Sequence, residues 1–302
     1  MRLVTRSDFD GLVCGVLLNV QGLLDNFAFV HPKDVQDGIF PLTQKDILAN
    51  LPYSPGCGMW FDHHSSEIER VGDVAVQGLV RIAPSCARVV WEYYGGHAKF
   101  SAHFDELLEA VDKVDSGMLS VDDVNNPKGW ILLGFIMDPR MRLQNQPGFS
   151  LKTYDLMVKL IEVCAVMPVE EVLALPPVAE RVERYWAHET QFRDMLRQCS
   201  RTDGNVLVTD LMGQQEIYSG NRFTAYAMFP ESNVSIQVMW GHKKERVVLA
   251  VGHSILNRTC KTDIGALMLR YGGGGHERVG TCQVKPENVD EVLAAVIAAV
   301  RE

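Results

Sequence analysis

The motif Asp62-His63-His64 stands directly after an apolar run. That run, 57–61, is typical of a short buried strand, which would deliver the three polar side chains to the end of a sheet. A carboxylate and two imidazoles are ligands that suit manganese, iron or zinc better than calcium or magnesium. A lone histidine pair is often merely a surface feature, so a metal site here requires further ligands elsewhere in the chain.

Two more acids, Asp8 and Asp10, lie at the end of a predicted strand over 2–7. Residues i and i+2 of an extended chain face the same way, so both carboxylates can point into one site. Two close carboxylates repel each other, and a hard divalent cation relieves that repulsion. Gly11 permits a tight turn into the helix that follows. The simpler alternative is a turn with an N-cap aspartate, but the presence of Asp62 favours a metal site.

Asp112 and Asp115 lie three residues apart at the end of a predicted helix, so they share one of its faces. A solvated helix end is the simpler interpretation of this pair. The alternative is that Asp115 closes the metal site from the far side, and Asp138 is a weaker candidate of the same kind.

Four consecutive glycines lie immediately before His276. Such a run leaves backbone N–H groups unobstructed and makes a natural cradle for an anion. Nearby histidine and arginine side chains can add charge-assisted hydrogen bonds to phosphate oxygens. The alternative is a flexible loop after a helix, but a helix C-cap needs one glycine and not four. The candidate substrate-binding residues are Gly272, Gly273, Gly274, Gly275, His276, His253 and Arg258.

The elements that must position these groups alternate between strands and helices in the first half of the chain. This alternation predicts an α/β domain with a doubly wound parallel sheet and helices on both faces. Ligands of such sheets bind at the carboxyl ends of the strands, which is where the acids of the first two motifs fall. The expected strands span 2–7, 27–31 and 57–61, the expected helices span 11–24, 84–96 and 104–114, and 43–49 is a short helix or strand.

The second half of the chain has a different organisation. Helical patterns fill the segment from about 150 to 200 and indicate a connector. Strand and helix patterns from 204 onward indicate a smaller C-terminal α+β domain. The resulting division is a metal-binding catalytic domain over 1–145, a helical connector over 146–203 and a substrate-binding domain over 204–302.

Composition narrows the class of protein further. The chain has 302 residues, 47% of them hydrophobic and 22% charged, which suits two folded domains. The net charge of −9 argues against a broad basic surface for long nucleic acid. A small anionic substrate stays compatible, because a metal supplies local positive charge. No apolar stretch suits a signal peptide or a membrane span, so no membrane partner is expected. The seven scattered cysteines contain no Cys-x-x-Cys pair and indicate a reduced cytoplasmic protein.

Taken in order, the early Asp-x-Asp pair, the Asp-His-His motif, the run 85–95 and the glycines before His276 resemble the DHH phosphoesterase superfamily with its DHH-associated C-terminal domain. That superfamily includes oligoribonucleases that also cleave phosphoadenosine phosphate, cyclic dinucleotide phosphodiesterases, single-strand exonucleases and exopolyphosphatases. The resemblance extends from residue 3 to about 284 and is weakest over 140–200.

The resemblance implies an active site in the cleft between the two domains that holds manganese, as one or two ions. The implied metal ligands are Asp8, Asp10, Asp62, His63 and Asp115, with His63 and His64 as catalytic residues. A metal-activated water would attack the phosphorus in line. The implied substrate is a short phosphate-containing anion: a single-stranded oligonucleotide of a few residues, a phosphorylated nucleotide, a cyclic dinucleotide or polyphosphate. The resemblance is also compatible with a homodimer.

The sequence departs from the family's pattern at three places, the first two by comparison with the oligoribonuclease-type members. Val4 stands where they carry a histidine four residues before the first aspartate. Asn50 is the best match to a metal-bound aspartate on the preceding strand, with Asp46 as the nearest acid. His253 and Ser254 replace an Arg-Ser pair. These replacements would reduce two metals to one, change the phosphate substrate or weaken catalysis.

The leading hypothesis is therefore a metal-dependent phosphohydrolase for a short anionic substrate. The alternative is a catalytically weakened nucleotide- or polyphosphate-binding protein of the same fold. A processive exonuclease for long single strands is disfavoured, because the chain is acidic and lacks a basic, aromatic-lined stretch.

Overall fold

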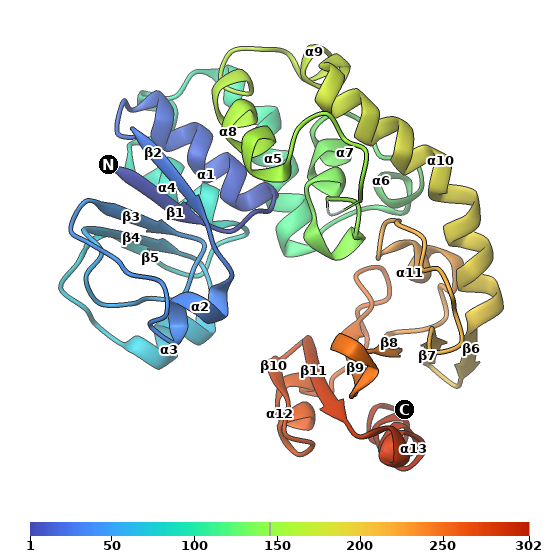
Figure 1. The fold of residues 1–302 in the computed structure, drawn as a ribbon. Helices are drawn as coiled ribbons and strands as arrows, with labels where there is room; N and C mark the ends of the chain where they lie inside the picture. Colours follow the sequence, from blue (N-terminus) through green and yellow to red (C-terminus); the bar gives the residue numbers. More distant parts are fainter. Residues whose placement is uncertain (145, 302) are drawn as a thin grey trace. The chain divides into compact units, whose positions relative to one another are not determined.

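The computed structural model describes residues 1–144 and 146–301. These residues form two compact units (Figure 1). The first unit comprises Met1–Met118 and Pro127–Tyr185, and the second comprises Leu119–Asn126 and the chain from Trp186 onward. The chain crosses to the second unit after Met118, returns after Asn126 and crosses again within helix α10 (Pro176–Cys199).

The described residues of the first unit form a five-stranded parallel sheet. Its strands are β1 (Arg2–Thr5), β2 (Asn26–Phe29), β3 (Asp46–Ala49), β4 (Met59–Asp62) and β5 (Gln77–Val80). They lie in the order β2-β1-β3-β4-β5, so the direction in which strands are added changes between β1 and β3. Ligands of doubly wound sheets bind beyond the carboxyl ends of the strands at such a switch point. The predicted doubly wound α/β domain is confirmed.

Helices cover both faces of this sheet (Figure 1). On one face Val4, Leu48 and Trp60 of the strands pack with Val35 of a short helix in a buried cluster. Burial on both faces is the reason that these strands are almost continuously apolar. The helices are α1 (Phe9–Val20), α2 (Pro32–Gln36), α3 (Ser65–Val71), α4 (Cys86–Tyr93), α5 (Asp105–Ser116), α7 (Gly129–Ile136), α8 (Thr153–Val163), α9 (Val169–Ala174) and the first part of α10, with 3-10 turns η1 (Gly96–Ala98), η2 (Ala102–Phe104) and η3 (Pro139–Met141).

The segment expected as a connector, 146–203, consists largely of helices α8, α9 and α10. Helix α8 packs on the first sheet, where the Tyr154 hydroxyl donates to the carbonyl oxygen of Phe27 at 3.1 Å. The Tyr154 ring also stands edge-on to Phe29, with 5.3 Å between the centroids. Helices α8 and α9 therefore belong to the first unit, and α10 is divided between the two.

The second unit contains a mixed sheet with strands in the order β10-β11-β9-β8-β7-β6. Strands β7 and β8 are parallel and the other neighbours are antiparallel, as expected of an α+β domain. These strands are β6 (Ser200–Asp203), β7 (Val206–Asp210), β8 (Val234–Trp240), β9 (Val247–His253), β10 (Gly274–His276) and β11 (Val279–Val284). The remaining elements are α6 (Val121–Asn125), the rest of α10, α11 (Thr224–Met228), η4 (His242–Lys244), α12 (Ile264–Leu269), η5 (Pro286–Asn288) and α13 (Val289–Val300).

Among the residues that the structure describes, no helix is long and apolar enough to cross a membrane.

Candidate active site

The turn between β1 and α1 positions the first pair of acids. Asp8 is the N-cap of α1, and its Oδ1 accepts a hydrogen bond from the N–H of Gly11 at 3.0 Å. Glycine is required at position 11, because a Cβ there would lie 2.2 Å from the carbonyl oxygen of Arg6. Asp10 is buried in the first turn of the helix. Asp8 thus caps a helix and still lies with Asp10 at the carboxyl end of β1.

The carboxylate of Asp10 is held by the first residues of α4. Its Oδ2 accepts from the N–H of Cys86 at 2.9 Å, and its Oδ1 accepts from the N–H of Ala87 at 2.8 Å. Burial, and then the charges of Asp115 and Asp8, raise the pKa of Asp10 well above its ordinary value and outweigh the two N–H groups. A nearby cation would favour the ionised form of this carboxylate.

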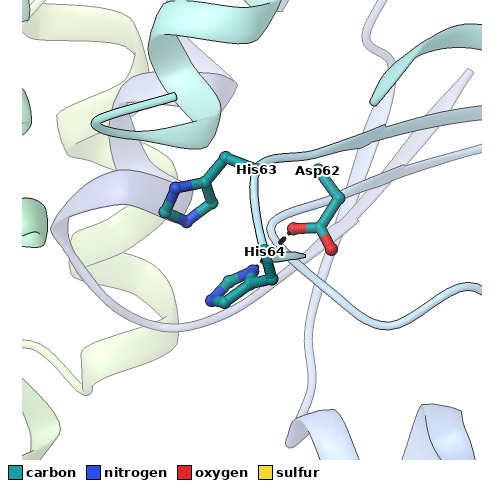
Figure 2. Close-up of side chains that lie close together, drawn as sticks. All are labelled: Asp62, His63 and His64. Carbon is teal, nitrogen blue, oxygen red and sulfur yellow. Dashed lines mark hydrogen bonds and ion pairs between the residues drawn. The ribbon is translucent and has the colours of Figure 1, made fainter. Parts of the chain in front are cut away.

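Strand β4 ends at Asp62, whose side chain is fully buried. Its Oδ1 lies 2.8 Å from Nδ1 of His64 (Figure 2). An ionised carboxylate can only accept, so Nδ1 of His64 carries the proton. Oδ2 of Asp62 has no hydrogen-bond partner among the described residues. Burial by itself lowers the pKa of His64, but the hydrogen bond and charge of Asp62, with the charge of Asp115, raise it overall.

The ring of His63 is oriented by the backbone. Its Nδ1 lies 3.1 Å from the carbonyl oxygen of Ala83, so Nδ1 is the protonated nitrogen and Nε2 faces the acids. Nε2 lies 3.2 Å from Asp115 Oδ2 and 3.7 Å from Asp10 Oδ2. The ring stands beside that of His64, with 4.2 Å between the centroids (Figure 2). A backbone carbonyl behind one nitrogen and ligand atoms in front of the other is the usual setting of a metal-binding histidine.

The end of α5 supplies Asp115, whose side chain is 28% exposed. Burial of the remainder raises the pKa of Asp115, and the charge of Asp8 adds to this, while the charge of His63 offsets part of it. Two groups of candidate ligand atoms result, each within 4.8 Å of one another: those of Asp62, His63 and His64, and those of Asp10, His63 and Asp115.

The neighbouring acid on α5, Asp112, is engaged elsewhere. Its Oδ1 accepts from the Ser85 hydroxyl at 2.6 Å, and its Oδ2 accepts from Nη2 of Arg88 at 2.6 Å. Ser85 is the N-cap of α4. Asp112 therefore stabilises the helix that holds Asp10.

Asn50 directly follows β3 and lies beside Asp8. Its Nδ2 donates to Asp8 Oδ1 at 3.3 Å, and its Oδ1 is buried without a partner among the residues described. Asp46 begins β3 and lies at the opposite end of the strand, where Nε of Arg2 binds it at 2.7 Å. Val4 is buried in the core and offers no ligand atom. The residue of β3 that reaches the site is thus Asn50 and not Asp46.

These residues fit a divalent cation. Asn50 Oδ1, Asp62 Oδ2 and His63 Nε2 are buried acceptor atoms without a hydrogen-bond partner in the part of the chain that the structure describes. Buried acceptors of this kind are costly, and a cation supplies the missing partner. Carboxylate and amide oxygens together with an imidazole nitrogen suit a first-row ion such as manganese.

In the second unit, the glycine run is divided between a helix end and a strand. The N–H groups of Gly272 and Gly273 donate to carbonyl oxygens of α12 at 3.1 and 3.0 Å. The expectation of four unobstructed N–H groups is wrong for these two glycines, because the end of the helix uses them. Gly274 and Gly275 form, with His276, the edge strand β10, which pairs with β11.

The two other predicted substrate-binding side chains have structural contacts of their own. His253 ends β9, and its Nε2 lies 2.9 Å from the carbonyl oxygen of Thr262. Nε of Arg258 donates to the carbonyl oxygen of Ile255 at 2.8 Å. Burial, and then the charge of Arg278, lower the pKa of Arg258. Two mutually repelling guanidinium groups in one place attract an anion.

Two guanidinium groups that sequence reasoning did not select also lie at the site of the first unit. Nε of Arg6 lies 2.9 Å from Asp8 Oδ2. Nε of Arg140 lies 2.8 Å from Asp138 Oδ1, so the weaker acidic candidate Asp138 is engaged by its own neighbour. The sequence signal for both arginines was their spacing, since each is two residues from an acid.

No protein-family model matches the chain, and no curated protein matches it either. Among solved structures, the chain is similar to the pGpG-specific phosphodiesterase PggH from Vibrio cholerae, with 47% identity over 99% of this chain and 98% of that one and a TM-score of 0.86. It is also similar to RecJ from Thermus thermophilus in complex with Mn²⁺, with 14% identity over 100% of this chain and 53% of that one and a TM-score of 0.51. The second likeness shows the fold alone, whereas the first extends over nearly the whole of both proteins.

Proposed function

The chain belongs to the DHH phosphoesterase superfamily, and we propose that its substrate is a linear dinucleotide such as pGpG. It is a phosphohydrolase of the DHH type. The observation that carries the proposed substrate is the 47% identity to a pGpG-specific phosphodiesterase over 99% of this chain. The carboxylate and imidazole cluster at the carboxyl ends of β1 and β4 supports the same chemistry.

Hydrolysis of such a dinucleotide breaks one phosphodiester bond. In the net reaction, water supplies a hydroxyl to the phosphorus and a proton that ends on the departing 3′ oxygen, directly or by restoring the proton of a general acid. The expected products of pGpG are therefore two molecules of GMP.

The proposed cofactor is one or two divalent ions, with Mn²⁺ as the ion that the donor set favours. Its proposed ligands are Asp8, Asp10, Asp62, His63 and Asp115. When bound, such an ion supplies a Lewis acid and lowers the pKa of a coordinated water. The protein holds the ligands in place through the N–H groups of α4 and the carbonyl of Ala83.

His64 is proposed to deliver the proton to the departing oxygen. Its bond to Asp62 favours the protonated ring and so raises the pKa of His64 against the opposing effect of burial. A raised pKa increases the protonated fraction of the imidazole, which favours a role as general acid.

In the second unit, the proposed phosphate-binding groups are Gly274, Gly275, His276 and Arg258. The exposed edge of β10 and the positive charges of Arg258 and Arg278 support this assignment. His253 contributes by holding the end of β9, because its Nε2 contacts Thr262.

A cytoplasmic location and a homodimer are also proposed. The seven cysteines are all unpaired, which agrees with a reducing compartment. Light scattering of the purified protein would measure the dimer directly.

The test is hydrolysis of a substrate panel by the protein purified with Mn²⁺. The panel contains pGpG, phosphoadenosine phosphate, a cyclic dinucleotide and polyphosphate, with products separated by chromatography. We expect conversion of pGpG to GMP, and its loss in Asp62→Asn and His63→Ala. Full turnover in both variants would contradict the assigned site. A metal-loaded wild type that binds pGpG without cleaving it would favour the alternative of a catalytically weakened binding protein.

A further inference from the structure

Two arginines differ from the other paired arginines around the first sheet in the way they meet their carboxylates. Arg2 and Arg88 each bind one carboxylate through both Nε and Nη2. Arg6 and Arg140 contact Asp8 and Asp138 through Nε. Within residues 1–144 and 146–301, the Nη atoms of Arg6 and Arg140 make no hydrogen bond. The donor forks of these two side chains are therefore available to another anion.

Both side chains are exposed enough to receive one. The Arg6 side chain is 31% exposed and the Arg140 side chain is 56% exposed. Nε and the backbone N–H of Arg140 both donate to Asp138 Oδ1, at 2.8 and 2.9 Å, which fixes the base of the side chain. The guanidinium group is thus anchored at Nε, on a side chain that is more than half exposed.

The segment that carries Arg140 is tied to the turn that carries the acids. Nε2 of Gln144 donates to the carbonyl oxygen of Ser7 at 3.3 Å and also to that of Met137. The charges of Asp8 and Asp115 act on Arg140 directly. Together with Asp138 they raise the pKa of Arg140 against the opposing effect of burial. The segment that carries Arg140 is therefore held at the turn before Asp8, within electrostatic reach of Asp8 and Asp115.

Arg6 is placed there by the chain itself, because it lies between β1 and Asp8. Its charge also acts on His64, where it opposes protonation. The two guanidinium groups thus approach one cluster from two different segments.

We propose that Arg6 and Arg140 bind the non-bridging oxygens of the scissile phosphate through their Nη groups. The forked guanidinium matches the geometry of phosphate oxygens and keeps its charge at every relevant pH. The need for such groups is evident in a protein of net charge −9 whose site carries several carboxylates. Because negative charge develops on the phosphate oxygens during attack, the arginines stabilise the transition state more than the bound substrate. This proposal rests on the proposed phosphodiesterase function.

Arg140 gives the sharper test, because its carboxylate partner Asp138 is not a proposed metal ligand. We expect Arg140→Gln to lower kcat for pGpG by roughly 10- to 100-fold, the cost of one charged hydrogen bond in the transition state. Arg140→Lys keeps the positive charge but lacks the forked guanidinium group. Its kcat should lie between those of the wild type and Arg140→Gln. Mn²⁺ content and unfolding temperature should stay those of the wild type, which a merely structural role would not predict.

Arg197→Gln is the matched control. Arg197 also pairs with one carboxylate, that of Asp194 at 2.6 Å, and its side chain is 60% exposed. Its removal should leave kcat and KM unchanged. Arg6→Gln should lower kcat in the same direction as Arg140→Gln, and its Mn²⁺ content is measured beside it because Arg6 contacts Asp8.

Two failures can be told apart. If the wild type cleaves pGpG and both arginine variants keep its kcat and KM, the arginines have no such role and the proposed function stands. If the Mn²⁺-loaded wild type does not cleave pGpG, the proposed function fails, and calorimetric binding of pGpG decides on the arginines. Weaker binding in Arg140→Gln would then support the assignment, whereas equal binding, or no binding by the wild type, would overturn it.

Discussion

Two acids on one helix have opposite roles in this protein. Asp112 accepts hydrogen bonds from Ser85 and Arg88, whereas Asp115, three residues later, faces His63. The spacing puts both acids on one side of α5. The role of each acid is set by the residues that the rest of the fold places beside it. Neutralising Asp115 should therefore weaken ion binding. Neutralising Asp112 should instead destabilise the first turn of α4.

Asp115→Asn should lower the affinity for Mn²⁺ by at least roughly 10-fold, because even residues that only support a metal ligand cost about that much. Equilibrium dialysis with elemental analysis measures the affinity. The matched control is Glu109→Gln, an exposed acid on the same helix that pairs with Lys113 at 2.8 Å. Equal Mn²⁺ affinity in wild type and Asp115→Asn would remove Asp115 from the ligand set.

Asn50→Asp replaces a donor by a charge beside Asp8. The bond from Asn50 Nδ2 to Asp8 is lost, and two buried carboxylates then face each other. We expect the free energy of unfolding without metal to fall by roughly 2–4 kcal/mol, and Mn²⁺ to restore more stability than in the wild type. Urea unfolding in EDTA and in Mn²⁺ measures both.

Asn126→Asp is the control for that substitution, since Asn126 also donates to a carboxylate, that of Asp122 at 2.8 Å, but on the surface. It should cost under about 0.5 kcal/mol with or without Mn²⁺. An Asn50→Asp protein as stable as the wild type in EDTA would show that Asn50 does not lie against Asp8.

Helix α4 connects helix capping to the chemistry of the site. Its first residues donate two N–H groups to Asp10, and Ser85 fixes those residues by accepting from the N–H of Arg88 at 3.0 Å. The Ser85 hydroxyl in turn donates to Asp112. A substitution that destabilises the start of α4 should therefore also disturb the position of the proposed metal ligand Asp10.

Ser85→Ala should lower the free energy of unfolding by about 1–2 kcal/mol, the usual cost of an N-cap, and should also weaken Mn²⁺ binding. Ser120→Ala removes the N-cap of α6, where Ser120 and Asp123 form a capping box in the second unit. This control should lose stability and keep the Mn²⁺ affinity of the wild type. Equal Mn²⁺ affinities in the two variants would contradict a role of α4 in holding Asp10.

Strands β1 and β4 could be predicted from the sequence, whereas the glycine-containing strands β5 and β10 could not. Both β1 and β4 are apolar runs that lead into carboxylates. The positions of these strands and of the acids at their ends could therefore be predicted. Strand β5 was missed because Gly78 interrupts it, yet the fold needs glycine there, since a Cβ would lie 2.0 Å from the Trp60 carbonyl oxygen. The edge strand β10 was predicted as a loop for the same reason. Arg140 was not selected, because only tertiary contacts bring η3 to the acids.

The folded protein brings several negative charges together at its candidate metal site. Four acids of one unit, Asp8, Asp10, Asp62 and Asp115, lie around two histidines in a protein that is already acidic. The raised pKa values of Asp10 and Asp115 record the free energy that this arrangement costs when the acids ionise. Stability of the whole chain should therefore depend on cations and on pH together.

We expect Mn²⁺ to raise the unfolding temperature more at about pH 8 than at about pH 5.5. Asp10 has a raised pKa in the folded protein, so its contribution to stability is present at acidic pH and is lost as pH rises through that pKa. A cation binds the ionised acids and restores stability where they have lost their protons. Thermal unfolding in Mn²⁺ and in EDTA across this range measures the difference. If the difference in unfolding temperature between Mn²⁺ and EDTA is the same at both pH values, metal binding is not linked to the ionisation of these acids.

His63 belongs to both groups of candidate ligand atoms, but an imidazole nitrogen has a single lone pair. Nδ1 is occupied by its proton toward Ala83, so Nε2 can serve one ion at a time. Two ions at this centre could therefore not be equivalent, because only one of them could take this nitrogen. An unequal pair of this kind fills in sequence, with the tighter position occupied first and the weaker one only at higher metal concentration.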